Sequence, residues 1–128
     1  MLNSTIITFS GTVIKGLGQA KKLALPTINL NPKFAPKSFR RGVYAAIVKT
    51  PVGIFPGALY FGPRFAPPCA LVLEVHCIGL KKNLYRKRVT VEIKKRLRKV
   101  LKFATAAKAK TAIKKDANLV RSFISLPA

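Results

Sequence analysis

Two glycines and two lysines lie close together near the N-terminus, in the segment Gly16 to Lys22. Gly16 and Gly18 leave backbone N–H groups open to close approach, and successive N–H groups can form a nest that binds an anion. Lys21 and Lys22 add mobile positive charge beside it. The segment therefore suits a phosphate group, although an ordinary hairpin turn would use the same residue types.

The residues after this loop carry oxygen atoms at a regular spacing. Pro26, Thr27 and Ile28 favour extended chain, which excludes the following helix that Walker and Rossmann loops require. Thr27 and Asn29 are two residues apart, so a strand would place both side chains on one face. Hydroxyl and amide oxygens are ligands that Mg²⁺ accepts together with substrate phosphates and water. The spacing alone is equally compatible with an ordinary strand.

The three acidic residues can be considered one by one. Asp116 lies among lysines in a helical segment, which predicts a solvated surface ion. Glu92 lies on the polar face of a predicted strand beside cations, which predicts a structural ion pair. Glu74 lies in the apolar stretch from Ala70 to Ile78, where a carboxylate costs free energy unless it is paired or used. An ion pair with a lysine and a catalytic role both remain open for Glu74, whereas His76 is expected to be structural.

The charge of the chain is extreme. It has 25 Lys and Arg residues against 3 Asp and Glu residues, a formal net charge of +22. Such an excess predicts binding to nucleic acid or another polyanion. With 128 residues, of which 49% are hydrophobic, the chain is expected to form one folded domain over residues 1–128.

The cysteines and the apolar segments indicate a compartment. Cys69 and Cys77 match no zinc pattern and cannot form a disulfide framework, which predicts reduced thiols and a cytoplasmic protein. The segment Met1 to Ser10 lacks a basic start before an apolar stretch, so no signal peptide is expected. The most apolar run, Gly42 to Phe61, is broken by a lysine and two prolines, and we expect no membrane partner.

Alternating and apolar segments predict several short strands. They run over Thr5 to Ile14, Leu25 to Leu30, Val43 to Thr50, Gly53 to Phe61 and Leu71 to Ile78, and within Asn83 to Ile93. We expect the first strand to be interrupted near Ser10-Gly11. The fourth is expected to kink or bulge at Pro56-Gly57.

Near the C-terminus the apolar spacing changes to three or four residues, which predicts an amphipathic helix. The apolar positions are Ala109, Ile113, Ala117, Val120 and Ile124. Thr105 is the expected N-cap. Short strands followed by one helix predict an all-β fold, a closed antiparallel barrel with the helix packed outside.

From Gly11 to Leu30 the chain closely resembles the signature of the riboflavin kinase (flavokinase) family. A strand, a glycine loop and a Pro-Thr-Ala-Asn element follow one another in the family's order and length, and the last reads Pro26-Thr27-Ile28-Asn29 here. Further family elements appear as Gly42-Val43-Tyr44, Asn83-Leu84-Tyr85, Leu97-Arg98 and Phe103. The resemblance covers about residues 9 to 124.

The resemblance implies a fold and an activity. The implied fold is a six-stranded antiparallel Greek-key barrel with a C-terminal α-helix. The implied activity is transfer of the γ-phosphate of ATP to the ribityl 5′-hydroxyl of riboflavin, giving FMN and ADP, with Mg²⁺ as the metal cofactor. At this length we expect a stand-alone kinase domain, monomeric and without the adenylyltransferase that makes FAD.

The resemblance also implies roles for individual residues. Glu74 falls on the position of the base that takes the proton from the 5′-hydroxyl, and Thr27 and Asn29 would hold Mg²⁺. Arg98 and Phe103 would border the flavin. The ATP-binding residues would be Gly16, Gly18, Lys21, Thr27 and Tyr85.

Several positions depart from the family pattern. Ala20 and Ala24 stand where glycines are usual, and Ile28 replaces a small alanine between the two magnesium ligands. Arg86 replaces a glycine after Tyr85. These departures bear on the geometry of the loops around the nucleotide.

A second function is compatible with the charge. A basic barrel that binds RNA or the ribosome without catalysis would also carry many lysines, and only the net charge of +22 supports it. As a kinase, the chain is expected to bind nucleic acid weakly and without sequence preference.

Overall fold

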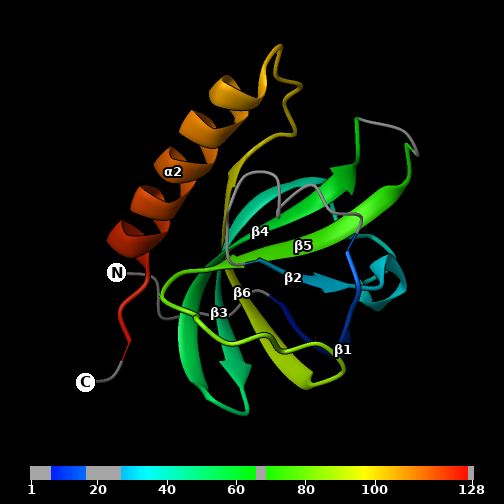
Figure 1. Cartoon of the computed structure of the whole chain (residues 1–128), viewed down its shortest axis with the longest axis vertical. Coiled ribbons are helices and arrows are strands. Elements are labelled where there is room, and N and C mark those ends of the chain that lie inside the picture. Colours follow the sequence, from blue (N-terminus) through cyan, green and yellow to red (C-terminus); the bar gives the residue numbers. More distant parts are fainter. Residues whose placement is uncertain (1–6, 17–26, 66–68, 127–128) are drawn as a thin grey trace.

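The computed structural model describes residues 7–16, 27–65 and 69–126. The strands are β1 (Ile7–Ile14), β2 (Thr27–Leu30), β3 (Gly42–Thr50), β4 (Gly53–Pro63), β5 (Leu71–Cys77) and β6 (Arg88–Arg98). A short 3₁₀ helix, η1 (Pro32–Phe34), follows β2, and the helix α2 (Ala106–Phe123) ends the fold (Figure 1).

The six strands close into an antiparallel barrel in the order β1-β2-β5-β4-β3-β6, with β6 returning to β1. Three consecutive strands, β3, β4 and β5, pair with their sequence neighbours, and β2 pairs with the far side of β5. This is Greek-key connectivity. The six-stranded barrel with a C-terminal helix is therefore confirmed.

Alternation along the strands explains which side chains fill the barrel. In β5, Leu73, Val75 and Cys77 are buried while the residues between them face outward. In β6, Val89, Val91 and Ile93 are buried in the same core, as their alternation predicts.

Three strand predictions need correction. β1 is continuous through Ser10 and Gly11, because both residues pair with β6. β4 keeps an unbroken register with β3 through Pro56, so no bulge forms there. Pairing with β5 begins only at Gly57, so the missing N–H of Pro56 costs no ladder bond on that side. β6 runs to Arg98, beyond the predicted end at Ile93.

Helix α2 lies against the outside of the barrel, across β3 and β4 (Figure 1). Thr105 is its N-cap, as predicted, and accepts a hydrogen bond from the backbone N–H of Lys108 at 3.1 Å. Val120 packs with the small side chains of Ala45 and Ala58, which allow the helix to approach the sheet closely. No helix within the described part of the chain is long and apolar enough to cross a membrane.

Candidate active site

The register of five neighbouring strands builds one row of side chains on the outer surface of the barrel. Asn29 lies opposite Glu74, and Glu74 lies opposite Tyr60. Tyr60 lies opposite Val43, which in turn lies opposite Arg98. Directly opposite residues on antiparallel strands share a face, so this row brings residues from β2 to β6 together.

A second row runs beside the first. Thr27 lies opposite His76, and His76 lies opposite Ala58. Because Thr27 and Asn29 are two residues apart on β2, both face the same side as Glu74. The barrel therefore gathers a hydroxyl, an amide and a carboxylate on one patch of its outer surface.

A cavity of about 340 Å³ lies over this patch, between the barrel, the 99–105 segment and α2. Four of the predicted site residues line it: Thr27, Glu74, Arg98 and Phe103. Its apolar walls include Val43, Val72, Leu101 and Ile113. A cavity with mostly apolar walls and a few convergent polar groups is the form that small-molecule sites usually take.

Burial raises the pKa of Glu74 above its ordinary value of 4.5, and the Arg64 guanidinium opposes that rise. Tyr60 neighbours Glu74 in the row, and burial together with the charge of Glu74 raises the pKa of the phenol. The Tyr60 hydroxyl donates to the backbone carbonyl of Pro63, which holds the ring over the cavity edge. A carboxyl with a raised pKa in a cavity is suited to accept a proton.

His76 lines the cavity in the second row. Burial lowers its pKa, the positive charge of Arg121 lowers it further, and the negative charge of Asp116 raises it. Burial therefore favours the neutral ring, and its Nδ1 atom is buried without a hydrogen-bond partner. This position leaves His76 able to contact a bound molecule, but no observation gives it a chemical role.

Asn29 contacts the start of the predicted phosphate loop. A Cβ atom added at Gly16 would lie 2.4 Å from Nδ2 of Asn29, so the Gly16 backbone rests directly against this side chain. Gly18 and Lys21, the other predicted phosphate ligands, lie outside the described residues. One predicted phosphate-binding residue, Gly16, therefore contacts one predicted magnesium ligand, Asn29.

The side-chain oxygen atoms of Thr27, Asn29 and Glu74 fit Mg²⁺ better than they fit a metal whose ligands all come from the protein. The described residues contain no group of three or more His, Cys, Asp or Glu side chains that could hold a metal. Thr27, Asn29 and Glu74 instead offer hard oxygen atoms on one face. Mg²⁺ usually takes one or two protein ligands and completes its shell with water and substrate phosphates.

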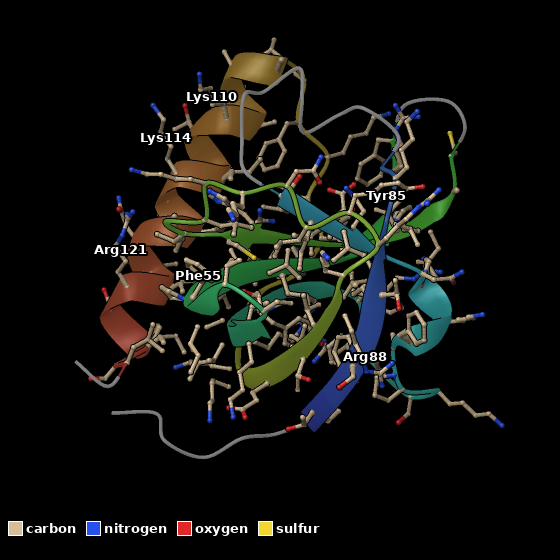
Figure 2. The ribbon with its side chains drawn as sticks, turned by 60° about the horizontal axis from the view of Figure 1, so that its bottom comes forward. Phe55, Tyr85, Arg88, Lys110, Lys114 and Arg121 are labelled. Atoms are coloured by element: carbon tan, nitrogen blue, oxygen red, sulfur yellow. The ribbon has the colours of Figure 1, made fainter. Side chains whose placement is uncertain are left out.

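Tyr85, a predicted ATP-binding residue, lies apart from the cavity walls. It is exposed, in the turn between β5 and β6, and Figure 2 shows it on the side of the barrel away from Lys114 and Arg121 of α2. The guanidinium of Arg86 lies 5.3 Å from the centre of its ring. Arg86 has φ of 69°, the left-handed region that favours the glycine the family uses there.

The prediction for Asp116 was wrong. Its side chain is buried rather than solvated and accepts two hydrogen bonds from Arg98, at 2.9 Å from Nε and 2.8 Å from Nη2. The same guanidinium lies 5.7 Å from the centre of the Phe103 ring. Glu92 behaves as predicted, in ion pairs with Lys49 at 2.8 Å and Lys94 at 3.7 Å.

Asp116 was missed because the two residues before it in the sequence are lysines. The apolar stripe of the helix already contained the signal, since Asp116 lies three residues after Ile113 and four before Val120. Residues at those spacings share a helix face. A carboxylate on the buried face of a helix needs a cationic partner, which Arg98 provides.

Comparison with known proteins identifies the family. The family model for flavokinase (riboflavin kinase) matches residues 4–124. The chain is 32% identical over 115 residues to the bifunctional riboflavin kinase/FMN adenylyltransferase of Pseudomonas fluorescens, covering 88% of this chain and 37% of that protein. The enzyme of the same description from Escherichia coli K12 is 31% identical over 124 residues, covering 91% and 38%. The chain thus spans less than two fifths of the length of these relatives.

Two solved structures share the fold. Riboflavin kinase from Trypanosoma brucei superposes with a TM-score of 0.65 at 19% identity, covering 94% of this chain and 80% of that one. A protein described as a macrolide-efflux protein from Streptococcus pneumoniae gives 0.78 at 20% identity, covering 91% and 39%. At these identities the likeness concerns the fold alone. Because the family model spans nearly the whole chain, the chain belongs to the riboflavin kinase (flavokinase) family.

Proposed function

We propose that this chain is a riboflavin kinase, which transfers the γ-phosphate of ATP to the 5′-hydroxyl of riboflavin and releases FMN and ADP. The observation that carries the proposal is the outer-surface row that puts Asn29 directly opposite Glu74, with Thr27 on the same face. Two of these three residues, Thr27 and Glu74, line the cavity of about 340 Å³.

Glu74 acts as the general base. Its carboxylate accepts the proton of the ribityl 5′-hydroxyl as the oxygen attacks the γ-phosphorus and the bond to the β-phosphate oxygen breaks. Because phosphoryl transfer passes through a loose transition state, positioning and charge neutralisation supply most of the catalysis. Orienting the hydroxyl, a task that Glu74 shares with its neighbours in the row, is therefore as important as the removal of its proton by Glu74.

Thr27 and Asn29 would hold Mg²⁺, and Gly16, Gly18 and Lys21 would bind the phosphates. When bound, Mg²⁺ neutralises charge on the phosphate oxygens of ATP. The Thr27 hydroxyl and the Asn29 amide could each supply one oxygen ligand, and the contact of Asn29 with Gly16 holds the amide beside the start of the loop. Tyr85 contacts the nucleotide from the turn between β5 and β6.

Arg98 and Phe103, which also line the cavity, bind the flavin. The isoalloxazine ring is planar, largely apolar and bordered by carbonyl groups. Phe103 and the apolar walls can pack against its face, and the N–H groups of Arg98 can donate to its carbonyl oxygens.

The test is incubation of the purified chain with riboflavin and Mg·ATP, followed by chromatographic separation of the flavins. We expect FMN and no FAD, because the family model for riboflavin kinase alone accounts for residues 4–124. Riboflavin that remains unchanged after prolonged incubation would reject the kinase assignment. FAD in the product would reject a single kinase domain.

We propose further that the enzyme is a cytoplasmic monomer. Cys69 and Cys77 are both free thiols, which fits a reducing compartment. The net charge of +22 favours separated chains through mutual repulsion. Light scattering of the purified protein at low and moderate salt tests the monomer.

The same charge supports weak, non-specific binding to nucleic acid. Five exposed basic residues lie along α2: Lys108, Lys110, Lys114, Lys115 and Arg121. Figure 2 shows three of these, Lys110, Lys114 and Arg121, on the side of the helix away from the barrel. The one acidic residue of α2 is turned inward to Arg98, so no carboxylate of the helix offsets this charge.

A further inference from the structure

We propose that Asp116 is a positioning residue for riboflavin, which acts by holding the Arg98 guanidinium in the orientation that binds the flavin ring. The inference rests on the proposed function. It assigns a role to a helix residue that neither the motifs nor the predicted site includes.

The geometry of the pair is that of a fixed fork. Nε of Arg98 donates to one carboxylate oxygen of Asp116 at 2.9 Å, and Nη2 donates to the other at 2.8 Å. Nη1 donates to the backbone carbonyl of Lys99 at 3.1 Å. A bidentate pair fixes the plane of the guanidinium as well as its position. These bonds use three of the five N–H groups of arginine, which leaves two for a ligand.

The location of the pair connects it to the cavity. Asp116 is only 4% exposed, and both Asp116 and Arg98 line the cavity. Arg98 also contacts the ring of Phe103, at 5.7 Å from its Cζ to the ring centre. Asp116 on α2 holds Arg98, and Arg98 contacts Phe103. Removing the Asp116 carboxylate would therefore disturb both residues proposed to contact the flavin.

Stability alone does not account for the pair. A buried ion pair loses hydration on both sides, and well-packed apolar residues in its place are often equally or more stable. Helix α2 is already anchored by Val120 and Ile124, which pack on Ala45 and Ala58. The pair contributes something that the apolar contacts cannot, a defined orientation of hydrogen-bond donors at the cavity wall.

The test compares riboflavin binding and steady-state kinetics for Asp116→Asn with those of the wild type. We expect the Kd and KM for riboflavin to rise about tenfold, with KM for ATP within about twofold, because a charge-assisted fork is lost on the flavin side only. Glu92→Gln is the matched control, since it removes one carboxylate from ion pairs with Lys49 and Lys94 outside the cavity. An equal loss in Glu92→Gln would attribute the effect to overall charge and overturn the proposal.

A double-mutant cycle separates positioning from direct contact. In an Arg98→Ala background, Asp116→Asn should change riboflavin affinity by less than about twofold, because its effect passes through Arg98. A full further loss in that background would mean that Asp116 contacts the flavin itself, which contradicts the proposal. A riboflavin KM unchanged in folded Asp116→Asn would also refute it.

Asp116→Glu keeps the charge and moves it by one methylene, so it is the test variant if Asp116→Asn does not fold. We expect it to melt near the wild type and to bind riboflavin several-fold more weakly, and unchanged affinity would overturn the inference. Failure of the proposed function has a different signature: the wild type itself would form no FMN and bind no riboflavin.

Discussion

Replacing Glu74 with glutamine removes the proposed base while keeping the shape of the side chain. The amide that replaces the carboxylate can still accept a hydrogen bond from a hydroxyl, but it cannot take the proton. Loss of a general base costs ~10²- to 10⁴-fold in rate, and the loose transition state of phosphoryl transfer places the expected loss near 10²-fold. That factor corresponds to about 2.7 kcal/mol of transition-state stabilisation, at about 1.36 kcal/mol per tenfold.

The stability of the same variant should move in the opposite direction. Burial raises the pKa of Glu74 in the folded state above its ordinary value of 4.5. Its stabilising contribution is therefore complete below the unfolded-state pKa and is lost as the pH rises through the folded-state pKa. At neutral pH the ionised carboxylate disfavours folding, so Glu74→Gln should melt at the same temperature as the wild type or higher. The difference in Tm should grow from acid to neutral pH.

The assay is single-turnover FMN formation with a melting curve on the same preparation. Glu92→Gln again serves as the control, because Glu92 is held by Lys49 and Lys94 outside the cavity. A structural ion pair at Glu74 predicts a lower Tm with turnover kept, which is the reverse of the expected pattern. Turnover of Glu74→Gln within about threefold of the wild type would remove Glu74 from the mechanism, since general-base loss costs far more.

Three further predictions concern the metal site, a strained turn and the surface charge. Thr27→Val or Asn29→Leu should shift the Mg²⁺ dependence of turnover to higher concentration with little change in Tm; an unchanged Mg²⁺ response in both would reject the ligands. Arg86→Gly should raise the free energy of unfolding by up to about 1 kcal/mol. A φ of 69° costs a non-glycine residue about 1–2 kcal/mol, and glycine recovers only part of this cost. Urea denaturation measures the change, and a lower stability of the variant would contradict the inferred strain. RNA should bind weakly, with a slope of log affinity against log salt that falls by about 1 for each of Lys110 and Lys114 replaced by glutamine. Nanomolar affinity for one sequence at high salt would favour the RNA-binding alternative.

The barrel could be predicted because its signals are local. The alternation of Leu73, Val75 and Cys77 identifies a half-buried strand without knowledge of its partners. The limits of the strands were less accurate. β6 continues past Ile93 because β3 offers it partners up to Arg98, and pairing between distant segments leaves no mark in a sequence window.

In the candidate site, too, local features could be predicted and contacts between distant segments could not. The spacing of Thr27 and Asn29 predicted a shared face, and the register with Glu74 is consistent with it. The Arg98–Asp116 pair joins residues 18 apart in sequence, on a strand and a helix that meet only after folding. The two lysines before Asp116 predicted that its side chain is exposed to solvent, and only the spacing of the apolar residues of the helix predicted burial.

Transfer of a labelled phosphate tests the central claim most directly. The chain is mixed with riboflavin, Mg²⁺ and ATP labelled at the γ-phosphorus, and the flavins and nucleotides are separated over time. A riboflavin kinase predicts label in FMN, one ADP for each FMN, and no label transferred to lumiflavin, which lacks the ribityl hydroxyl. Release of labelled inorganic phosphate with riboflavin left intact, or no turnover of ATP at all, would contradict the account.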